Sequence, residues 1–312
     1  MNTFWEPKLN HDKFGLTSGV FSYLLWGFLP LYWKLLADID SKEIICHRCF
    51  WSLILVVVIF LIRNPSKKIE DFLSIKKTYW FAIVAGTFCI SLNWFINVKA
   101  VNTGHIVESS LGYYINPIFS VFLGTVFFKE RLNSNQWIAV IIASVGVLLL
   151  IYLGGEVPWI SLSITLTFGG YGLFKKLSPV STTLRMLIEL SILSAFLIPI
   201  LYYWEYTNEF NFQSYSFSTK ILLFGAGFAT ILPLLCFGHA VINLNLSTLG
   251  FLQYIAPTLQ FLMGILVFNE KLSASYFVAF GFIWLAIALY TADCVLSMKK
   301  KVTTSIVVID VR

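Results

Sequence analysis

Charged residues are scarce in this chain. Asp, Glu, Lys and Arg make up 12% of its 312 residues and apolar residues 58%, against about 25% and about 45–50% in ordinary globular chains. So few charges cannot cover the surface of a soluble fold of this length, and the mean hydropathy of +0.79 agrees. The sequence therefore predicts an all-α membrane protein rather than two soluble domains. We expect a small-molecule substrate and membrane lipids as its partners, and we do not interpret the net charge of +6 as a sign of nucleic-acid binding.

Cysteines and catalytic motifs are also sparse. The five cysteines are an odd number and all lie in apolar runs, so no disulfide framework is expected. The sequence has no His-Glu-x-x-His, no glycine-rich phosphate loop and no Gly-x-Ser-x-Gly turn. His47 lies between Cys46 and Cys49, but only the two cysteines share a helical face. We therefore expect no enzyme activity, no metal and no cofactor, and a transport cycle driven by an ion gradient or by the substrate's own gradient.

Ten apolar segments, each about long enough to cross a bilayer, are separated by short connections with turn-forming or charged residues. They cover residues 15–36, 43–62, 79–99, 104–128, 135–153, 158–175, 183–204, 220–241, 245–268 and 275–297. The first is expected to be retained, because no small-residue cleavage site follows it.

Basic residues fix the expected orientation. With a cytoplasmic N-terminus, most of the 22 Lys and Arg residues fall on cytoplasmic segments, and Lys175, Lys176 and Arg185 are counted there. Segments 1–14 and 298–312 are then a cytoplasmic N-terminal segment and a cytoplasmic tail, as an even number of spans requires.

Two stretches of the chain match at a constant offset. Tyr114-Ile115-Asn116-Pro117 matches Tyr254-Ile255-Ala256-Pro257, and Phe128-Lys129-Glu130-Arg131-Leu132 matches Phe268-Asn269-Glu270-Lys271-Leu272. The match predicts two five-helix repeats, 15–153 and 158–297. Because five is odd, the second repeat begins on the opposite side of the membrane, so the two halves are inverted. This arrangement is typical of carriers that present one central site to either side, although duplication also builds inert scaffolds and some channels.

Several motifs resemble those of RarD proteins, in the EamA branch of the drug/metabolite transporter superfamily. The resemblance covers about residues 15 to 297 and includes Trp26-Gly27, His47-Arg48, Asn93-Trp94, Leu111-Gly112-Tyr113, Leu249-Gly250-Phe251 and Gln253-Tyr254-Ile255. It implies a ten-span carrier of the bacterial inner membrane, made of two inverted halves, that exports small metabolites or drugs.

Ionisable groups at bilayer depth are costly and need a reason, at roughly 2.5–3.5 kcal/mol each on insertion scales. Arg48 lies within the second span and Glu108 within the fourth. They are candidates for binding substrate, but a structural pair that holds two helices in register is equally open. Glu189, in the seventh span, is a candidate for proton coupling, as is Glu108.

Helical spacing adds further candidates. Glu108, Gly112 and Asn116 recur every four residues, as do Asn93 and Asn97, so each set shares one face. Such a polar face suits a substrate cavity, and it also suits close helix packing. The predicted substrate-binding residues are Arg48, Asn93, Trp94, Asn97, Glu108, Tyr113, Asn116, Gln253 and Tyr254. The sequence makes no prediction of oligomeric state, and the rival hypothesis is a polytopic membrane enzyme that uses His47, Arg48 and Glu108 near the outer interface.

Overall fold

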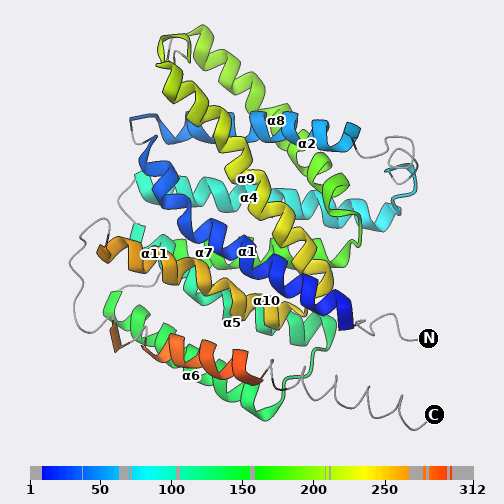
Figure 1. The fold of residues 1–312 in the computed structure, drawn as a ribbon, viewed down its shortest axis with the longest axis vertical. Helices are drawn as coiled ribbons and strands as arrows, with labels where there is room; N and C mark the ends of the chain where they lie inside the picture. The colour runs from blue at the N-terminus through cyan, green and yellow to red at the C-terminus, as the bar shows by residue number, and fades with distance from the viewer. Residues whose placement is uncertain are drawn as a thin grey trace.

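A computed structural model of the chain describes residues 9–36, 38–62, 70, 72–102, 106–154, 159–207, 209–210, 212–266, 277–278, 281–293 and 296. Within these residues, side chains are described except at 9–12, 41, 98, 101–102, 106–111, 150, 153–154, 261 and 264–266. All regular secondary structure in the described part is helical (Figure 1).

The long helices follow the apolar runs of the sequence. Their bounds are α1 Leu9–Lys34, α2 Ser41–Ile62, α4 Lys77–Asn102, α5 Ile106–Phe128, α6 Ser134–Gly154, α7 Trp159–Leu177, α8 Thr182–Tyr206, α9 Phe217–Asn243, α10 Leu246–Gln253 and α11 Ile255–Leu266, with a 3₁₀ turn, η1, at Phe212–Ser214. A further apolar helix covers Gly281–Asp293.

Each of the ten predicted segments therefore contains helix. Five helical stretches are long and apolar enough to cross a membrane: Lys13–Lys34, Lys42–Ile62, Lys77–Asn97, Thr182–Tyr206 and Phe217–Asn243. Each exposes large apolar side chains, such as Phe28 on α1 and Phe88 on α4. Because water would penalise such surfaces, their natural surroundings are lipid.

The ninth segment differs from its prediction as one continuous helix over 245–268. It divides at Tyr254 into α10 and α11. Pro257 lies three residues later; it lacks an N–H, and its ring would clash with the carbonyl of Gln253 in a straight helix. The N–H of Tyr254 donates instead to the carbonyl of Phe251, at 3.3 Å.

The helices pack in a fixed set of neighbours. α1 packs along α9 and α11, α7 packs along α4 and α5, and α2 contacts α8 and α9. In Figure 1, α8 and α2 lie at one edge of the molecule, and α6 lies at the other. The helix at 281–293 joins α6 there, since Ile283, Ala286 and Tyr290 share an apolar cluster with Ala139 and Ala143.

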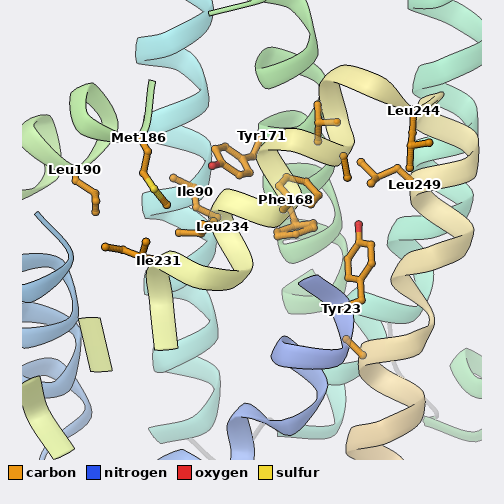
Figure 2. Close-up of a cluster of buried hydrophobic side chains, with 14 of the residues drawn as sticks. Tyr23, Ile90, Phe168, Tyr171, Met186, Leu190, Ile231, Leu234, Leu244 and Leu249 are labelled. Atoms are coloured by element: carbon orange, nitrogen blue, oxygen red, sulfur yellow. The ribbon is translucent and has the colours of Figure 1, made fainter. Parts of the chain in front are cut away.

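An aromatic cluster fills the centre of the molecule. This aromatic core consists of Tyr23, Trp26, Phe168, Tyr171 and Phe237, from α1, α7 and α9. The rings of Tyr171 and Phe237 stack with their centroids 5.9 Å apart. In Figure 2, Phe168 and Tyr171 lie together with Ile90 and Leu234 around them, and Tyr23 approaches from its own helix.

Candidate functional site

Arg48 lies in an aromatic cage. Its guanidinium group is 4.8 Å from the ring centre of Trp33 and 5.1 Å from that of Trp94, so the cation is attracted to two indole faces. Its Nε donates to the hydroxyl of Thr230 on α9 at 3.0 Å. The half-buried Arg48 cluster (Trp33, Arg48, Trp94 and Thr230) thus joins α1, α2, α4 and α9 around one positive charge.

The predicted polar faces of α4 and α5 meet beside this cluster. Asn97 donates to the hydroxyl of Tyr113 at 3.1 Å, and that hydroxyl donates to Oδ1 of Asn93 at 3.3 Å. The amide nitrogen of Asn93 donates in turn to the carbonyl of Ile164 and the hydroxyl of Thr167 on α7, both at 3.1 Å. Asn93, Asn97 and Tyr113 therefore form one chain of hydrogen bonds that ends on the second half of the sequence.

Asn116 and Gln253 connect the halves directly. The Nδ2 atom of Asn116 donates to Oε1 of Gln253 at 2.6 Å, and both side chains are buried. The other amide atoms, Oδ1 of Asn116 and Nε2 of Gln253, have no hydrogen-bond partner among the described residues. Burying a polar atom without a partner is costly, so these two atoms are suited to bind a polar group of a ligand or a water molecule.

A small cavity adjoins this amide pair. Its volume is about 10 Å³, room for about one water molecule. Asn116, Gln253, Phe168 and Phe237 are among the residues that line it. This cavity itself has no room for a larger molecule.

The two remaining predicted substrate-binding residues are Tyr254 and Glu108. Tyr254 is fully buried, and its ring centroid is 6.4 Å from that of Tyr114, its equivalent in the repeat. Glu108 falls in α5, but its side chain lies outside the described residues. Its predicted proximity to Arg48 therefore stays a prediction.

Glu189 belongs to a buried ionic cluster that sequence reasoning missed. Its Oε1 accepts from Nε of Arg185 at 2.7 Å, and its Oε2 lies 3.6 Å from Nζ of Lys175. The hydroxyl of Tyr171 donates to the same Oε2 at 3.1 Å. Lys175 and Arg185 are each 1% exposed, although the sequence places them with the cytoplasmic connections. The i, i+4 spacing of Tyr171 with Lys175 and of Arg185 with Glu189 could have indicated these two pairs, but not their burial.

Glu130 is a second residue that was not predicted as functional. Its carboxylate accepts from the backbone N–H groups of Leu246 and Ser247, at 2.7 and 3.0 Å, and so caps the N-terminus of α10. Gly124 makes room for it, because a Cβ there would lie 2.4 Å from Glu130 Oε2. Lys176 reaches the same place, 3.9 Å from Glu130. The repeated Phe-x-Glu-basic-Leu motif was the signal that could have identified it.

A third carboxylate, Glu43, is fully buried near the start of α2. The hydroxyl of Tyr215, in the connection between α8 and α9, donates to it at 2.7 Å. Burial, the hydrogen bond to Glu43 and the negative charge of Glu43 raise the pKa of Tyr215 well above its ordinary value. The phenol therefore stays a hydrogen-bond donor throughout the physiological pH range.

Known proteins resemble the chain along most of its length. The model of the EamA-like transporter family matches residues 13–152. An uncharacterized transporter of Pseudomonas aeruginosa is 41% identical, over 92% of this chain and 96% of the relative. The protein RarD of Escherichia coli is 35% identical, over 92% of this chain and 97% of the relative. The chain belongs to the RarD/EamA family.

Two further likenesses extend this result. The uncharacterized transporter YojE of Bacillus subtilis is 37% identical, over 89% of this chain and 94% of its own length. A solved crystal structure with 18% sequence identity shares the fold, with a TM-score of 0.65 over 91% of this chain and 98% of the other. Family membership and the apolar helices identify a membrane transporter of the drug/metabolite superfamily, with several passes through the bacterial inner membrane.

Proposed function

We propose that this RarD/EamA-family transporter is a secondary carrier that exports small metabolites or drugs by alternating access. Its ten spans form two inverted repeats, 15–153 and 158–297, with both termini in the cytoplasm. The predicted site residues Arg48, Asn93, Trp94, Asn97, Tyr113 and Asn116 of the first repeat and Gln253 of the second bind the substrate, together with Glu108 and Tyr254.

The pairing of the helices carries this proposal. In a five-span repeat, α1 corresponds to α7, α4 to α9, and α5 to α10 and α11 together. The contact of α1 with α9 is then equivalent to that of α7 with α4, and the contact of α1 with α11 to that of α7 with α5. A two-fold axis in the membrane plane relates such contacts, and this symmetry lets one site face either side in turn.

The position of the polar residues adds support. Gln253 and Tyr113 are equivalent in the repeat, and each hydrogen-bonds to an asparagine side chain of the first repeat, Asn116 and Asn97 respectively. Asn116 and Gln253 hold unpartnered amide atoms beside a cavity closed to about one water. Polar groups from both halves converge beside this small cavity, as we expect for an occluded intermediate of the proposed carrier.

Counterflow in proteoliposomes tests the function. The purified protein is reconstituted with one member of a panel of amino acids and antibiotics at high concentration inside, and the labelled compound is added outside. Transient accumulation of unmodified label supports a carrier. Appearance of a chemically changed product supports the membrane-enzyme hypothesis instead. Arg48→Ala is compared with the unchanged chain: weaker exchange at normal protein yield supports substrate binding, and low yield with normal exchange supports a structural role.

Topology reporters test the inverted architecture separately. A reporter fused at either terminus should report the cytoplasmic side. Termini on opposite sides of the membrane would exclude two five-span repeats.

A further inference from the structure

Lys175 carries the one buried charge of its cluster that no opposite charge balances. The cluster, here called the Lys175 cluster, consists of Tyr171 and Lys175 on α7 and Arg185 and Glu189 on α8. All four are buried, and the cluster contains two cations and one carboxylate. Moving a charge out of water is costly unless it is paired, so the surplus charge needs an explanation.

Arg185 is the fixed partner of Glu189. Besides its 2.7 Å contact with Glu189, its Nη1 donates to the carbonyls of Phe174 and Lys175, at 3.0 and 3.2 Å, and to the hydroxyl of Ser178. Its Nη2 donates to the carbonyl of Ala82 on α4 at 3.3 Å. A guanidinium group does not lose its proton in proteins. Arg185 therefore balances Glu189 permanently, and the surplus charge is that of Lys175.

The hydrogen bonds around Lys175 do not require its charge. Its Nζ donates to the hydroxyl of Tyr171 at 2.6 Å, and that hydroxyl donates a hydrogen bond to Glu189. A neutral amine can make the same donation, so the geometry survives the loss of one proton. What changes is the charge alone.

The surroundings of Lys175 contain no second anion among the described residues. On α9, Gly238 lies directly against it, since a Cβ there would be 2.9 Å from Lys175 Cε, and the neighbouring His239 packs edge-on against Phe14 instead. On its own helix, Lys176 is directed to Glu130 and to the carbonyl of Leu244. The groups facing Lys175 are thus Tyr171, Arg185 and Glu189, and the site lies two residues from the end of α7.

We propose that Lys175 is a proton-binding residue of the transport cycle and that the coupling ion is the proton. The ammonium group releases H⁺ to water at this end of α7 and becomes a neutral amine, and the Arg185–Glu189 pair remains balanced. Rebinding of H⁺ restores the surplus charge, which favours a conformation in which water reaches the amine. Protonation therefore opens this end of the protein, and deprotonation allows it to close. This inference rests on the proposed carrier function.

A cysteine probe tests the inference without any knowledge of the substrate. Gly172 lines the central cavity one turn from Lys175, and a Cβ there meets no other atom within 4 Å. In a chain with its five native cysteines replaced, Gly172→Cys is labelled with a charged maleimide in detergent at mildly acidic and mildly alkaline pH. Each rate is divided by the rate for the same cysteine in a Lys175→Met background, which removes the pH dependence of the thiol itself.

We expect the normalised rate to rise about fivefold or more as the pH falls, the lower limit of typical coupling between two sites. Lys175→Arg, which keeps a permanent charge opposite Glu189, should show no response to pH. It also keeps the proposal testable if Lys175→Met does not fold, with Lys175→Arg then serving as the reference. A flat ratio in the unchanged background, or a pH response that persists in Lys175→Arg, overturns the proposal.

The neighbouring lysine is the matched control. Lys176→Met should keep the pH response, because its partners are Glu130 and Leu244; loss of the response in this variant alone would assign the proton to Lys176 and overturn the proposal. Substrate counterflow with no pH response in labelling would refute the role of Lys175 and leave the carrier intact. A pH response in labelling without counterflow of any compound would count against the carrier function and leave the proton-binding role of Lys175 intact.

Discussion

The hydrogen bond between Asn116 and Gln253 should make the effects of removing these two residues non-additive. We consider Asn116→Ala, Gln253→Ala and the double variant. The pair is joined at 2.6 Å, and each side chain is at most 4% exposed. Either single variant leaves the other amide buried without a partner, at a cost of about 1–3 kcal/mol. The double variant leaves neither amide buried without its partner, so its loss of unfolding free energy should be smaller than the sum of the two single losses.

The expected departure from additivity can be estimated from hydrogen bonds measured between helices in membranes. Hydrogen bonds between helices in bilayers contribute about 0.6 kcal/mol on average and at most about 1.7 kcal/mol. We expect the short, fully buried Asn116–Gln253 contact in the upper part of that range. The assay is reversible unfolding in mixed micelles with increasing denaturing detergent, from which the free energy of unfolding is obtained for all four proteins.

Additivity within about 0.3–0.5 kcal/mol would refute the reasoning, because sites that do not interact add to that accuracy. Ser144→Ala is the control: this hydroxyl donates only within its own helix, to Val140, and its loss should change the free energy of unfolding by no more than about 0.5 kcal/mol. In counterflow, Asn116→Ala should abolish exchange while the protein still inserts and is purified normally.

Three further outcomes are expected. Glu189→Gln leaves two buried cations without a counter-charge, so the free energy of unfolding should fall by about 3–5 kcal/mol, and an unchanged value would contradict the ionic cluster. Glu130→Gln keeps the shape of the α10 cap but loses its charge, so stability should fall by about 1 kcal/mol in the same assay, the difference between charged and neutral hydrogen bonds. The raised pKa of Tyr215 means that its contribution is complete below the ordinary phenol value of about 10 and is lost as the pH rises through the higher folded value. Above about pH 10, unfolding should therefore become easier more steeply for the unchanged chain than for Tyr215→Phe, and equal slopes would show that the contact with Glu43 adds nothing.

The positions of the helices could be predicted from the sequence, and so could the residues that share one polar helix face. Apolar runs fix where helices form in lipid, because backbone groups there must be satisfied within the helix. The periodic placement of Asn93 and Asn97 put them on one face, and the structure joins both to Tyr113. The break at Tyr254 could not be predicted from Pro257 alone, because the equivalent Pro117 of the first repeat leaves α5 continuous.

The buried cations could not be predicted in the same way. Lys175 and Arg185 lie near helix ends, and at helix ends the positive-inside tendency gives a sufficient reason for a basic residue. Whether such a residue is in water or in protein depends on which helices meet at that end. Here α4 and α9 cover the place, with Ala82 and Gly238 against the two cations. No spacing rule along one helix contains that information.

The proposed carrier cycle assigns different roles to the Arg48 cluster and the Lys175 cluster. Inverted repeats give both end states of the cycle nearly the same backbone packing, so the balance between them depends on side chains that the repeat does not duplicate. Arg48 lies half-buried between two indoles on one half, and the equivalent position on the other half, Ile188, is apolar and adjoins Glu189. In the proposed carrier cycle a difference of about 1.4 kcal/mol changes the ratio of the two end states tenfold, so we expect this asymmetry to influence which side is open at rest. Substitutions in the Arg48 cluster and in the Lys175 cluster should therefore shift the resting state in opposite directions, and two variants that shift it the same way would place both clusters on one side of the gate.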